Sequence, residues 1–394
     1  MSNVVQLRDP RQPTAPLQDH LAPVFAQFPL EVVDAQGVYL HTPDGRKVLD
    51  LYGGHAVAAL GYNHPRWVEA LTNQARQLCF QSNAVPLDVR RRAAAKLAKF
   101  CGLGLDTIFF VNSGAEANEN ALKLAFKMTG GTEVIAVEGS FHGRTAAAGA
   151  VTWGAEKKWY GFPGKPFDVK FIKPTEAHKL ATLVNDKTAA VIVEPVQGVA
   201  GAVDLPKEFL QALRTRCSEN GSILIFDEVQ CGVGRTGYPF AANMVGITPD
   251  IITTAKALGA GFPVSAVLVA DHVAEYMKID SLGTTFGAGP MACAVVEAVI
   301  DIIESENLLE NVRLRSAEIR EKCVVGPVVG TQGAGFLLGL RTTRPAKDVQ
   351  AELLKLDILT GTSGDPNIVR ILAPFVLGSE HVDQLADALK RIGK

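Results

Sequence analysis

Residues 107–128, TIFFVNSGAEANENALKLAFKM, contain a short apolar run, a turn of small residues and a stretch with helical periodicity. Similar β-branched apolar runs follow along the chain: EVIAV (133–137), VKFI (169–172), AAVIVEP (189–195), SILIFDE (222–228), DIITT (250–254) and VSAVLVA (264–270). Helical stretches separate some of these runs. Strands that alternate with helices form a mostly parallel sheet covered on both faces. The sequence therefore predicts an α/β fold.

The segments on either side of this alternation have a different pattern. Residues 1–30 are rich in Pro, Gln and Ala, and we expect a loosely packed arm or one short helix there. Apolar spacing predicts further helices at 65–80, 89–100, 291–304, 308–323 and 380–392. We divide the chain into an N-terminal arm with part of a small domain (1–45), a large domain (46–285) and a C-terminal small α+β domain (286–394).

Charge and composition exclude several classes of function. The 394 residues carry 39 Lys and Arg against 41 Asp and Glu, so nucleic acid has no general electrostatic footprint to bind. No run approaches the roughly 18 apolar residues of a membrane span, and the N-terminal residues lack the apolar core of a secretory signal. The six scattered cysteines form no CxxC pair, and no spacing of His and Cys suits zinc. We expect a cytoplasmic enzyme without a metal, a membrane partner or a nucleic-acid partner.

Lys256 is the one charged residue in IITTAKALGAGFPVSAVLVA (251–270). Such a lysine can extend its amine from a buried strand end to water. Desolvation also lowers the pKa of an ammonium group and makes the amine nucleophilic enough to form a Schiff base. Asp227 ends the apolar run SILIF, where ligands gather at the carboxyl ends of parallel strands, although an Asp there can also cap a turn. Pyridoxal phosphate requires such a pair, a lysine for its aldehyde and a carboxylate for its ring nitrogen.

Ser113, Gly114 and Ala115 lie between a predicted strand and a predicted helix. Small residues at a helix N-terminus leave backbone N–H groups free to bind a phosphate. Many such junctions bind nothing. The sequence here is neither GxxxxGK[ST] nor GxGxxG, which disfavours a nucleotide.

Six segments taken together resemble the class III (fold-type I) pyridoxal-phosphate aminotransferases. They are NSGAEANENALKLA (112–125), FHGRT (141–145), VEPVQG (193–198), LIFDEVQCGVGRTG (224–237), TTAKALGAGFP (253–263) and GTTFGAGPMACA (283–294). The resemblance extends from about residue 30 to the C-terminus, and the acetylornithine and N-acylornithine aminotransferases are the most similar within the class. It implies a seven-stranded, mostly parallel sheet in the large domain and a small domain built from both ends of the chain.

The resemblance implies a set of residues that bind the cofactor. Lys256 joins the cofactor's aldehyde and carries a proton between two carbons, while Asp227 pairs with the ring nitrogen. The other implied cofactor-binding residues are Ser113, Gly114, Ala115, Phe141, Glu228, Val229, Gln230 and Thr285. Phe141 and Val229 take the two ring faces, and Gln230 reaches the phenolic oxygen. The backbone of Gly114 and Ala115 binds the phosphate, together with Thr285 of a neighbouring subunit.

Three residues are implied in substrate binding. Arg144 holds the α-carboxylate as a bidentate fork, which a lysine cannot reproduce. Thr284 contacts an N-acyl group, and Arg370 corresponds to the second carboxylate-binding arginine. Because Thr285 acts on a neighbouring subunit, the resemblance implies a homodimer with shared active sites.

The sequence departs from the family pattern at two positions. Where the family has VEPIQGEGG, this chain has VEPVQGVAG, so Val199 replaces the glutamate that pairs with the second arginine. Gly289 replaces an asparagine. The first change leaves Arg370 without its usual partner, and we expect a substrate carboxylate or solvent to satisfy it. With valine at position 199, this segment is also similar to that of a subgroup whose members accept more acidic N-acyl groups.

We expect an aminotransferase that moves the terminal amino group of N-acetylornithine or N-succinylornithine to 2-oxoglutarate, a step of arginine biosynthesis. The products are the N-acyl glutamate semialdehyde and glutamate. One alternative is another ω-amino acid transaminase acting on ornithine, 4-aminobutyrate or a lysine-pathway donor. A second is a PLP-dependent aminomutase, and a third is a regulatory relative without catalysis. A nucleotide-dependent dehydrogenase would need the glycine fingerprint that this chain lacks.

Overall fold

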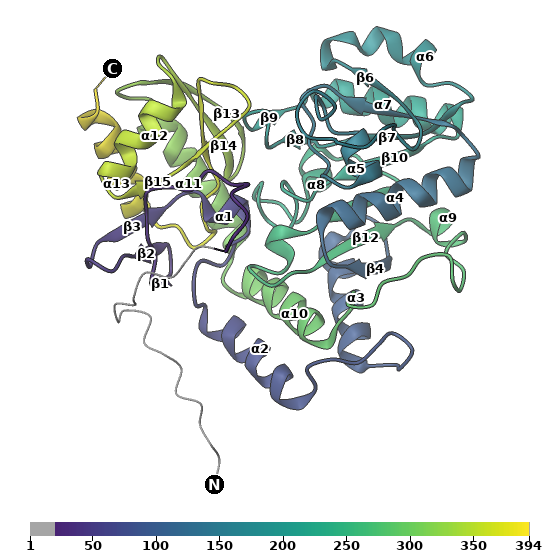
Figure 1. Cartoon of the computed structure of the whole chain (residues 1–394), viewed down its shortest axis with the longest axis horizontal. Helices are drawn as coiled ribbons and strands as arrows, with labels where there is room; N and C mark the ends of the chain where they lie inside the picture. The colour runs from purple at the N-terminus through teal and green to yellow at the C-terminus, as the bar shows by residue number, and fades with distance from the viewer. Residues whose placement is uncertain (1–19, 394) are drawn as a thin grey trace.

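The computed structural model describes residues 20–393, and its largest element is a seven-stranded sheet (Figure 1). In spatial order the strands are β4 (Thr107–Val111), β12 (Ser265–Val269), β11 (Ile251–Thr254), β10 (Ile223–Asp227), β7 (Thr188–Val193), β5 (Glu133–Val137) and β6 (Asp168–Ile172). β12 runs antiparallel to both of its neighbours, and all other pairs are parallel. The prediction of an α/β fold with a mostly parallel sheet is confirmed.

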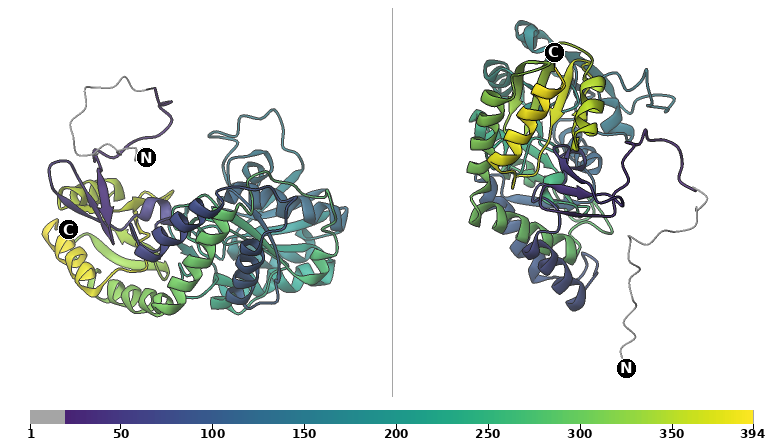
Figure 2. Two further views of the ribbon diagram at one scale, coloured as in Figure 1. Left: turned by 90° about the horizontal axis from the view of Figure 1, so that it is seen from below. Right: turned by 90° about the vertical axis from the view of Figure 1, so that its left-hand side faces the viewer.

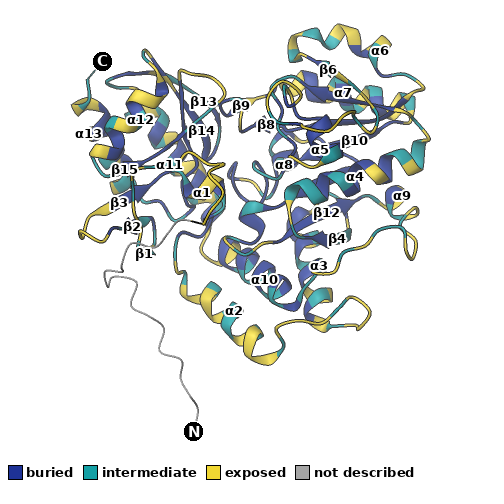
Figure 3. Ribbon diagram, viewed as in Figure 1, coloured by how far each residue is buried: buried dark blue, intermediate teal, exposed yellow. Residues whose placement is uncertain are grey.

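Helices cover both faces of this sheet, which explains why its strands are apolar at nearly every position. On one face, Ala190 and Ile225 pack with α4 (Gly114–Thr129) and α5 (Ala146–Ala150). On the other, Val191 and Leu224 pack with α7 (Lys207–Asn220), α3 (Asp88–Cys101) and α10 (Pro290–Ser305). Figure 3 shows the buried strands between helices whose outer surfaces are exposed. The carboxyl ends of the strands remain uncovered by helices, and the candidate site lies there.

A smaller unit combines both ends of the described chain. It contains two four-stranded sheets. The first has the strand order β1 (Asp34–Gln36), β2 (Tyr39–His41), β3 (Lys47–Asp50) and β15 (Ile358–Leu359). The second has the order β13 (Val328–Ala334), β14 (Leu337–Thr342), β17 (Ile368–Ile371) and β16 (Gly361–Thr362). Its helices are α11 (Leu308–Lys322), α12 (Ala346–Lys355) and α13 (Ser379–Arg391). Figure 2 shows the yellow C-terminal helix on the outer side of this unit, away from the large sheet. β2 and β3 pair in one sheet across the predicted boundary at 45/46, and α10, which packs on the large sheet, lies beyond the predicted boundary at 285/286. The division into domains stays a prediction.

The remaining helices agree with the sequence to within a few residues. α2 covers Pro65–Gln77 and ends before the predicted Phe80. The other short elements of the described residues are α1 (Gly53–Ala56), α6 (Leu180–Leu183), α8 (Ala241–Val245), α9 (Asp271–Ala274), β8 (Val196–Gln197), β9 (Val203–Asp204) and the 3-10 helices η1 (Pro174–Lys179) and η2 (Lys256–Leu258). Residues 20–30 form no helix, and the rest of the predicted N-terminal arm lies outside the described residues. Within residues 20–393, no helix is both long and apolar enough to cross a membrane.

Arg235 joins the two units through the loop that follows β10. Its side chain is fully buried, Nη1 donates to the carbonyl of Ala373, and Nη2 donates to the carbonyl of Ala56 at 3.1 Å. The guanidinium lies 4.6 Å from the ring centroid of Phe375. No carboxylate pairs with Arg235 anywhere in the described part of the chain, and burial lowers its pKa to about 9. Backbone carbonyls and an aromatic face therefore hold a buried cation between the units.

Candidate active site

Three neighbouring strands bring acidic and basic side chains to one edge of the large sheet. Asp227 ends β10, Glu194 follows β7, and Lys256 lies two residues beyond the end of β11. The register places Phe226 beside Val193 and Asp227 beside Thr253, so the strand ends are level. A cavity of about 400 Å³ opens above them. Its lining includes Ser113, Gly114, Ala115, Phe141, His142, Glu194, Val199, Asp227, Val229, Gln230 and Lys256.

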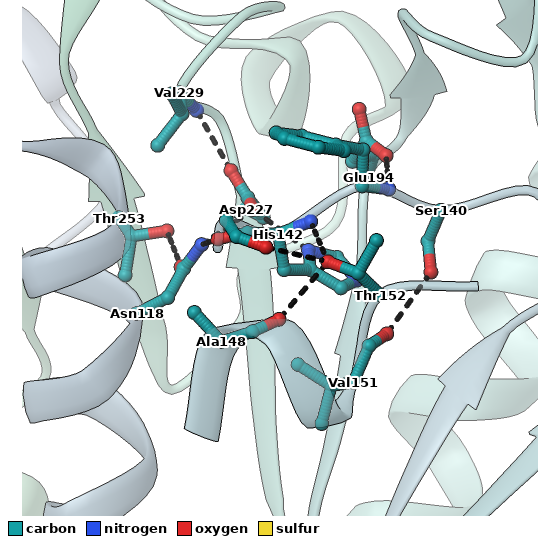
Figure 4. Close-up of polar contacts among 12 residues, drawn as sticks. Asn118, Ser140, His142, Ala148, Val151, Thr152, Glu194, Asp227, Val229 and Thr253 are labelled. Atoms are coloured by element: carbon teal, nitrogen blue, oxygen red, sulfur yellow. Dashed lines mark hydrogen bonds and ion pairs between the residues drawn. The ribbon is translucent and has the colours of Figure 1, made fainter. Parts of the chain in front are cut away.

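Asp227 is fixed by donors on both of its oxygens. Asn118 Nδ2 and His142 Nδ1 each lie 2.7 Å from Oδ2, and the backbone N–H of Val229 donates to Oδ1 at 3.0 Å (Figure 4). Thr253 Oγ1 in turn donates to Asn118 Oδ1 at 2.7 Å. The network therefore holds the Asp227 carboxylate in a fixed position at the cavity.

Lys256 occupies a strained turn directly after β11. Its φ of 45° lies in the left-handed region, which non-glycine residues rarely adopt and which costs about 1–3 kcal/mol. Burial lowers the pKa of its ammonium group, although Asp227 and Glu194 act in the opposite direction. The lowered pKa increases the fraction of Lys256 that is an uncharged, nucleophilic amine.

The N-terminus of α4 forms one wall of the cavity. The Ser113 side chain caps the helix by accepting the backbone N–H of Glu116 at 3.1 Å. A Cβ atom on Gly114 would lie 2.7 Å from Cγ1 of Val229, so only glycine fits there. Backbone N–H groups at a helix start are an anion site, and this one opens beside Asp227 and Lys256.

Phe141, which lines the cavity, lies beside an aromatic ring and a cation that do not line it. The ring centroid of Phe141 lies 6.3 Å from that of Trp159, and the guanidinium of Arg144 lies 5.3 Å above the Trp159 ring. Arg144 is exposed and forms no ion pair within residues 20–393. It is therefore available to an incoming carboxylate.

Gly53–Ala56 form a left-handed turn beside the cavity, with φ between 56° and 69° at all four residues. Asp50 Oδ1 accepts the backbone N–H groups of Tyr52 and Gly53, at 2.7 and 2.9 Å. A Cβ atom on Gly53 would lie 2.7 Å from the Leu372 carbonyl oxygen, so glycine is required. The turn directs His55 Nε2 to the Tyr52 hydroxyl, at 2.5 Å.

Arg370 differs from what the sequence led us to expect. Its Nε donates to the Thr362 carbonyl at 2.7 Å, and Nη1 donates to the Gly198 carbonyl at 3.1 Å. Backbone carbonyls therefore satisfy part of the guanidinium, which we had left to solvent or substrate. Val199, at the position of the missing glutamate, lines the cavity and is 38% exposed.

Five residues of the predicted site do not line the cavity in this chain: Arg144 and Arg370, described above, and Glu228, Thr284 and Thr285. Both carboxylate oxygens of Glu228 accept backbone N–H groups at the start of α8, from Ala241 and Ala242. Thr284 Oγ1 accepts from Asn112 Nδ2 at 3.2 Å and from the backbone of Gly287 at 3.1 Å. Thr285 is exposed. Glu228 thus caps a helix, and neither threonine reaches the cavity within its own chain.

The sequence reasoning missed Glu194 and the roles of Asn118 and His142. Glu194 carried a usable signal, because it is a polar residue directly after a buried parallel strand, as Asp227 is. Asn118 and His142 carried none. Their part in the site depends on a loop and a helix face meeting beside β10.

A buried lysine with a lowered pKa, a fixed carboxylate and a helix N-terminus around one cavity are the groups that a pyridoxal-dependent enzyme requires. The comparisons agree with this class. Residues 22–392 match the family model described as aminotransferase class-III, and the chain belongs to this family.

Two relatives and two solved structures illustrate the similarity. The acetylornithine aminotransferases of Methanocaldococcus jannaschii and Methanopyrus kandleri are 36% and 38% identical, covering 94% of this chain and 94% and 96% of theirs. The ornithine aminotransferase structure from Toxoplasma gondii has a TM-score of 0.88 at 27% identity, over 95% of this chain and 92% of that one. An acetylornithine aminotransferase structure from Elizabethkingia anophelis has a TM-score of 0.83 at 28% identity, over 95% of this chain and 96% of that one.

Proposed function

We propose that the cavity binds pyridoxal 5'-phosphate and that the enzyme transfers the terminal amino group of an N-acylornithine to 2-oxoglutarate. The juxtaposition of Lys256 and Asp227 at adjacent strand ends is the observation that carries this proposal. Further support comes from two polar atoms that line the cavity region, because Gln230 Oε1 and His142 Nε2 are buried and have no hydrogen-bond partner in the described part of the chain. Val229 also approaches Gly114 so closely that a Cβ atom there would clash, so the N-terminus of α4 carries no side chain at this wall of the cavity. These features fit the cofactor.

The residues of this chain would divide the work as follows. Lys256 would hold the cofactor and afterwards move a proton between substrate and cofactor carbons. Asp227 would keep a proton on the ring nitrogen, with His142 and Asn118 holding the carboxylate still. Phe141 and Val229 would enclose the ring. When bound, pyridoxal phosphate supplies an aldehyde for the amine and a ring that accepts electrons.

N-Acetylornithine or N-succinylornithine is the proposed donor, and the step belongs to arginine biosynthesis. The names of the relatives support the N-acylornithine class. Arg144 would bind the donor's α-carboxylate as a bidentate partner. Arg370 would bind a second carboxylate, either on 2-oxoglutarate or on a succinyl group, because Val199 supplies no competing acid.

A donor panel tests this proposal. The holoenzyme is assayed with 2-oxoglutarate and, in turn, N-acetylornithine, N-succinylornithine, ornithine, 4-aminobutyrate and N-acetyllysine, and glutamate formation is measured. We expect the highest kcat/KM for one of the two N-acylornithines. A higher value for ornithine or 4-aminobutyrate would replace the proposal with the alternative ω-transaminase.

We further propose a homodimer with shared sites that works in the cytoplasm. The exposed Thr285 would then contact the phosphate in the other subunit, together with Gly114 and Ala115 there, since C2 pairing is the commonest arrangement. All six cysteines are free thiols, as expected in a reducing compartment.

A further inference from the structure

Glu194 is a buried carboxylate with no part in the reaction as proposed above. It is 4% exposed and lines the cavity. Oε1 accepts the backbone N–H of Phe141 at 2.8 Å, and Oε2 accepts the backbone N–H of Gly198 at 3.1 Å. The Glu194 carboxylate thus connects the backbone at Phe141 with the backbone at Gly198, the residue before Val199.

The same segment connects Glu194 to Arg370. The Gly198 N–H is bound by Glu194, and the Gly198 carbonyl accepts from Arg370 Nη1, so a single residue separates acid from guanidinium. Arg370 forms no ion pair within the described part of the chain. Burial lowers its pKa, while the charges of Tyr52 and Glu194 raise it. Glu194 is therefore a carboxylate that acts on Arg370 from a distance, in a chain that has valine at position 199.

Glu194 also lies where its charge responds to other charges. Burial, reinforced by Asp227 and opposed by His142, raises its pKa to about 7. The titratable groups that face it electrostatically are His142, Asp227, Cys231, Lys256 and Arg370. A carboxyl group with this pKa exchanges its proton near neutral pH, and a new negative charge nearby favours the protonated form.

We infer that Glu194 balances the charge of Arg370 when no distal carboxylate is bound, and takes up a proton from solvent when a substrate's distal carboxylate binds Arg370. The inference rests on the proposed function, because it requires a dicarboxylate such as 2-oxoglutarate at Arg370. Ionised Glu194 and the substrate carboxylate would repel each other in a medium of low dielectric constant. Glu194 is thus a positioning residue that makes dicarboxylate preference depend on pH.

Binding of two unreactive ligands to the holoenzyme tests this inference. Glutarate and pentanoate share one carboxylate and differ at the distal end, so the ratio of their Kd values isolates the distal charge and cancels effects of the shared carboxylate. Between pH 6 and pH 8, we expect the preference for glutarate to fall about fivefold, which corresponds to a rise of about one unit in the pKa of Glu194 when the distal carboxylate binds. In Glu194→Gln the preference is expected to change by less than about twofold.

Two control variants separate Glu194 from its neighbours. His55 also feels Arg370 and titrates, with a pKa lowered chiefly by burial, so His55→Asn is expected to keep the pH dependence of the unmodified enzyme. Glu228 is a buried glutamate that also accepts two backbone amides, but these lie at α8, so Glu228→Gln is expected to keep it as well. A pH dependence that disappears in His55→Asn and persists in Glu194→Gln overturns the inference.

A measurement on the unmodified enzyme covers the case in which Glu194→Gln does not fold. Calorimetric titration near pH 7 in two buffers of different ionisation enthalpy is expected to show more proton uptake with glutarate than with pentanoate. Equal uptake overturns the inference. Equal affinity for glutarate and pentanoate at every pH also overturns the inference, because it shows that no distal carboxylate is bound. The proposed amino transfer is tested separately by the donor panel.

Discussion

His142 Nδ1 lies 2.7 Å from Asp227 Oδ2, and both side chains are withdrawn from solvent. His142 reaches this position from the loop after β5, and Asp227 from the end of β10, two strands away in the sheet. The histidine therefore contacts the carboxylate directly, and we expect it to influence the reaction through Asp227. Its second nitrogen, Nε2, is buried and has no hydrogen-bond partner among residues 20–393.

Replacement of Asp227 is expected to be the most damaging single change after loss of the lysine. Removing one partner of a buried pair costs about 3–5 kcal/mol, and a loss of this size in the transition state predicts a kcat/KM for Asp227→Asn that is lower by roughly 10²–10⁴-fold. His142→Asn keeps a donor and is expected to lose less. Steady-state kinetics, with folding checked by circular dichroism, measure both changes; equal losses in the two variants would contradict the indirect role of His142.

Lys256 is expected to carry the cofactor covalently. Borohydride reduction of the holoenzyme followed by peptide mapping should place the pyridoxyl group on this residue. Label on another lysine would refute the assignment, and Lys256→Ala provides the unlabelled control.

Shared sites are expected to show complementation. A Lys256→Ala chain lacks the lysine of its own site, and a Thr285→Ala chain lacks the threonine that would contact the phosphate in its partner's site. Mixing them after mild dissociation should create dimers with one intact site and restore part of the activity. A fully active monomer at assay concentration would exclude the shared arrangement.

Val199→Glu is expected to alter the choice of donor. The new carboxylate would face Arg370 and compete with a succinyl carboxylate, which predicts a selective loss of about 1–3 kcal/mol for N-succinylornithine, the range for a hydrogen bond to a charged group. The ratio of kcat/KM for the succinyl over the acetyl donor measures this loss. Val199→Gln, which has a similar shape without the charge, is the matched control, and an unchanged ratio in Val199→Glu would show that position 199 does not set donor choice.

Glu228 is expected to make stability depend on pH. Burial raises the pKa of its carboxyl group to about 8, against an unfolded value near 4.5. Since the folded state binds the proton more tightly, the free energy of unfolding should fall as pH rises from about 4.5 to 8. Denaturant melts of Glu228→Gln should show a shallower fall over this range than the unmodified chain.

The strands and their order of appearance were predictable because buried parallel strands are continuous apolar runs. Lys256 and Asp227 were predictable for the same reason, since a charge stands out within such a run. The contact between His142 and Asp227 was not, because it depends on how a loop packs against a neighbouring strand. The carbonyl partners of Arg370 were equally hidden, since any residue supplies a carbonyl.

Arg235 has a consequence for engineering this enzyme. Its guanidinium donates to the carbonyl of Ala373 on one side and to that of Ala56 on the other. Arg235 lies only eight residues along the chain from Asp227. A chimaera that exchanges the C-terminal unit for that of a relative must therefore keep the backbone carbonyl of Ala373 in the same place, in addition to complementary side chains at the junction. A mismatch there would misalign the catalytic loop itself, so compatible recombination points lie outside the segment 227–235 and its two carbonyl partners.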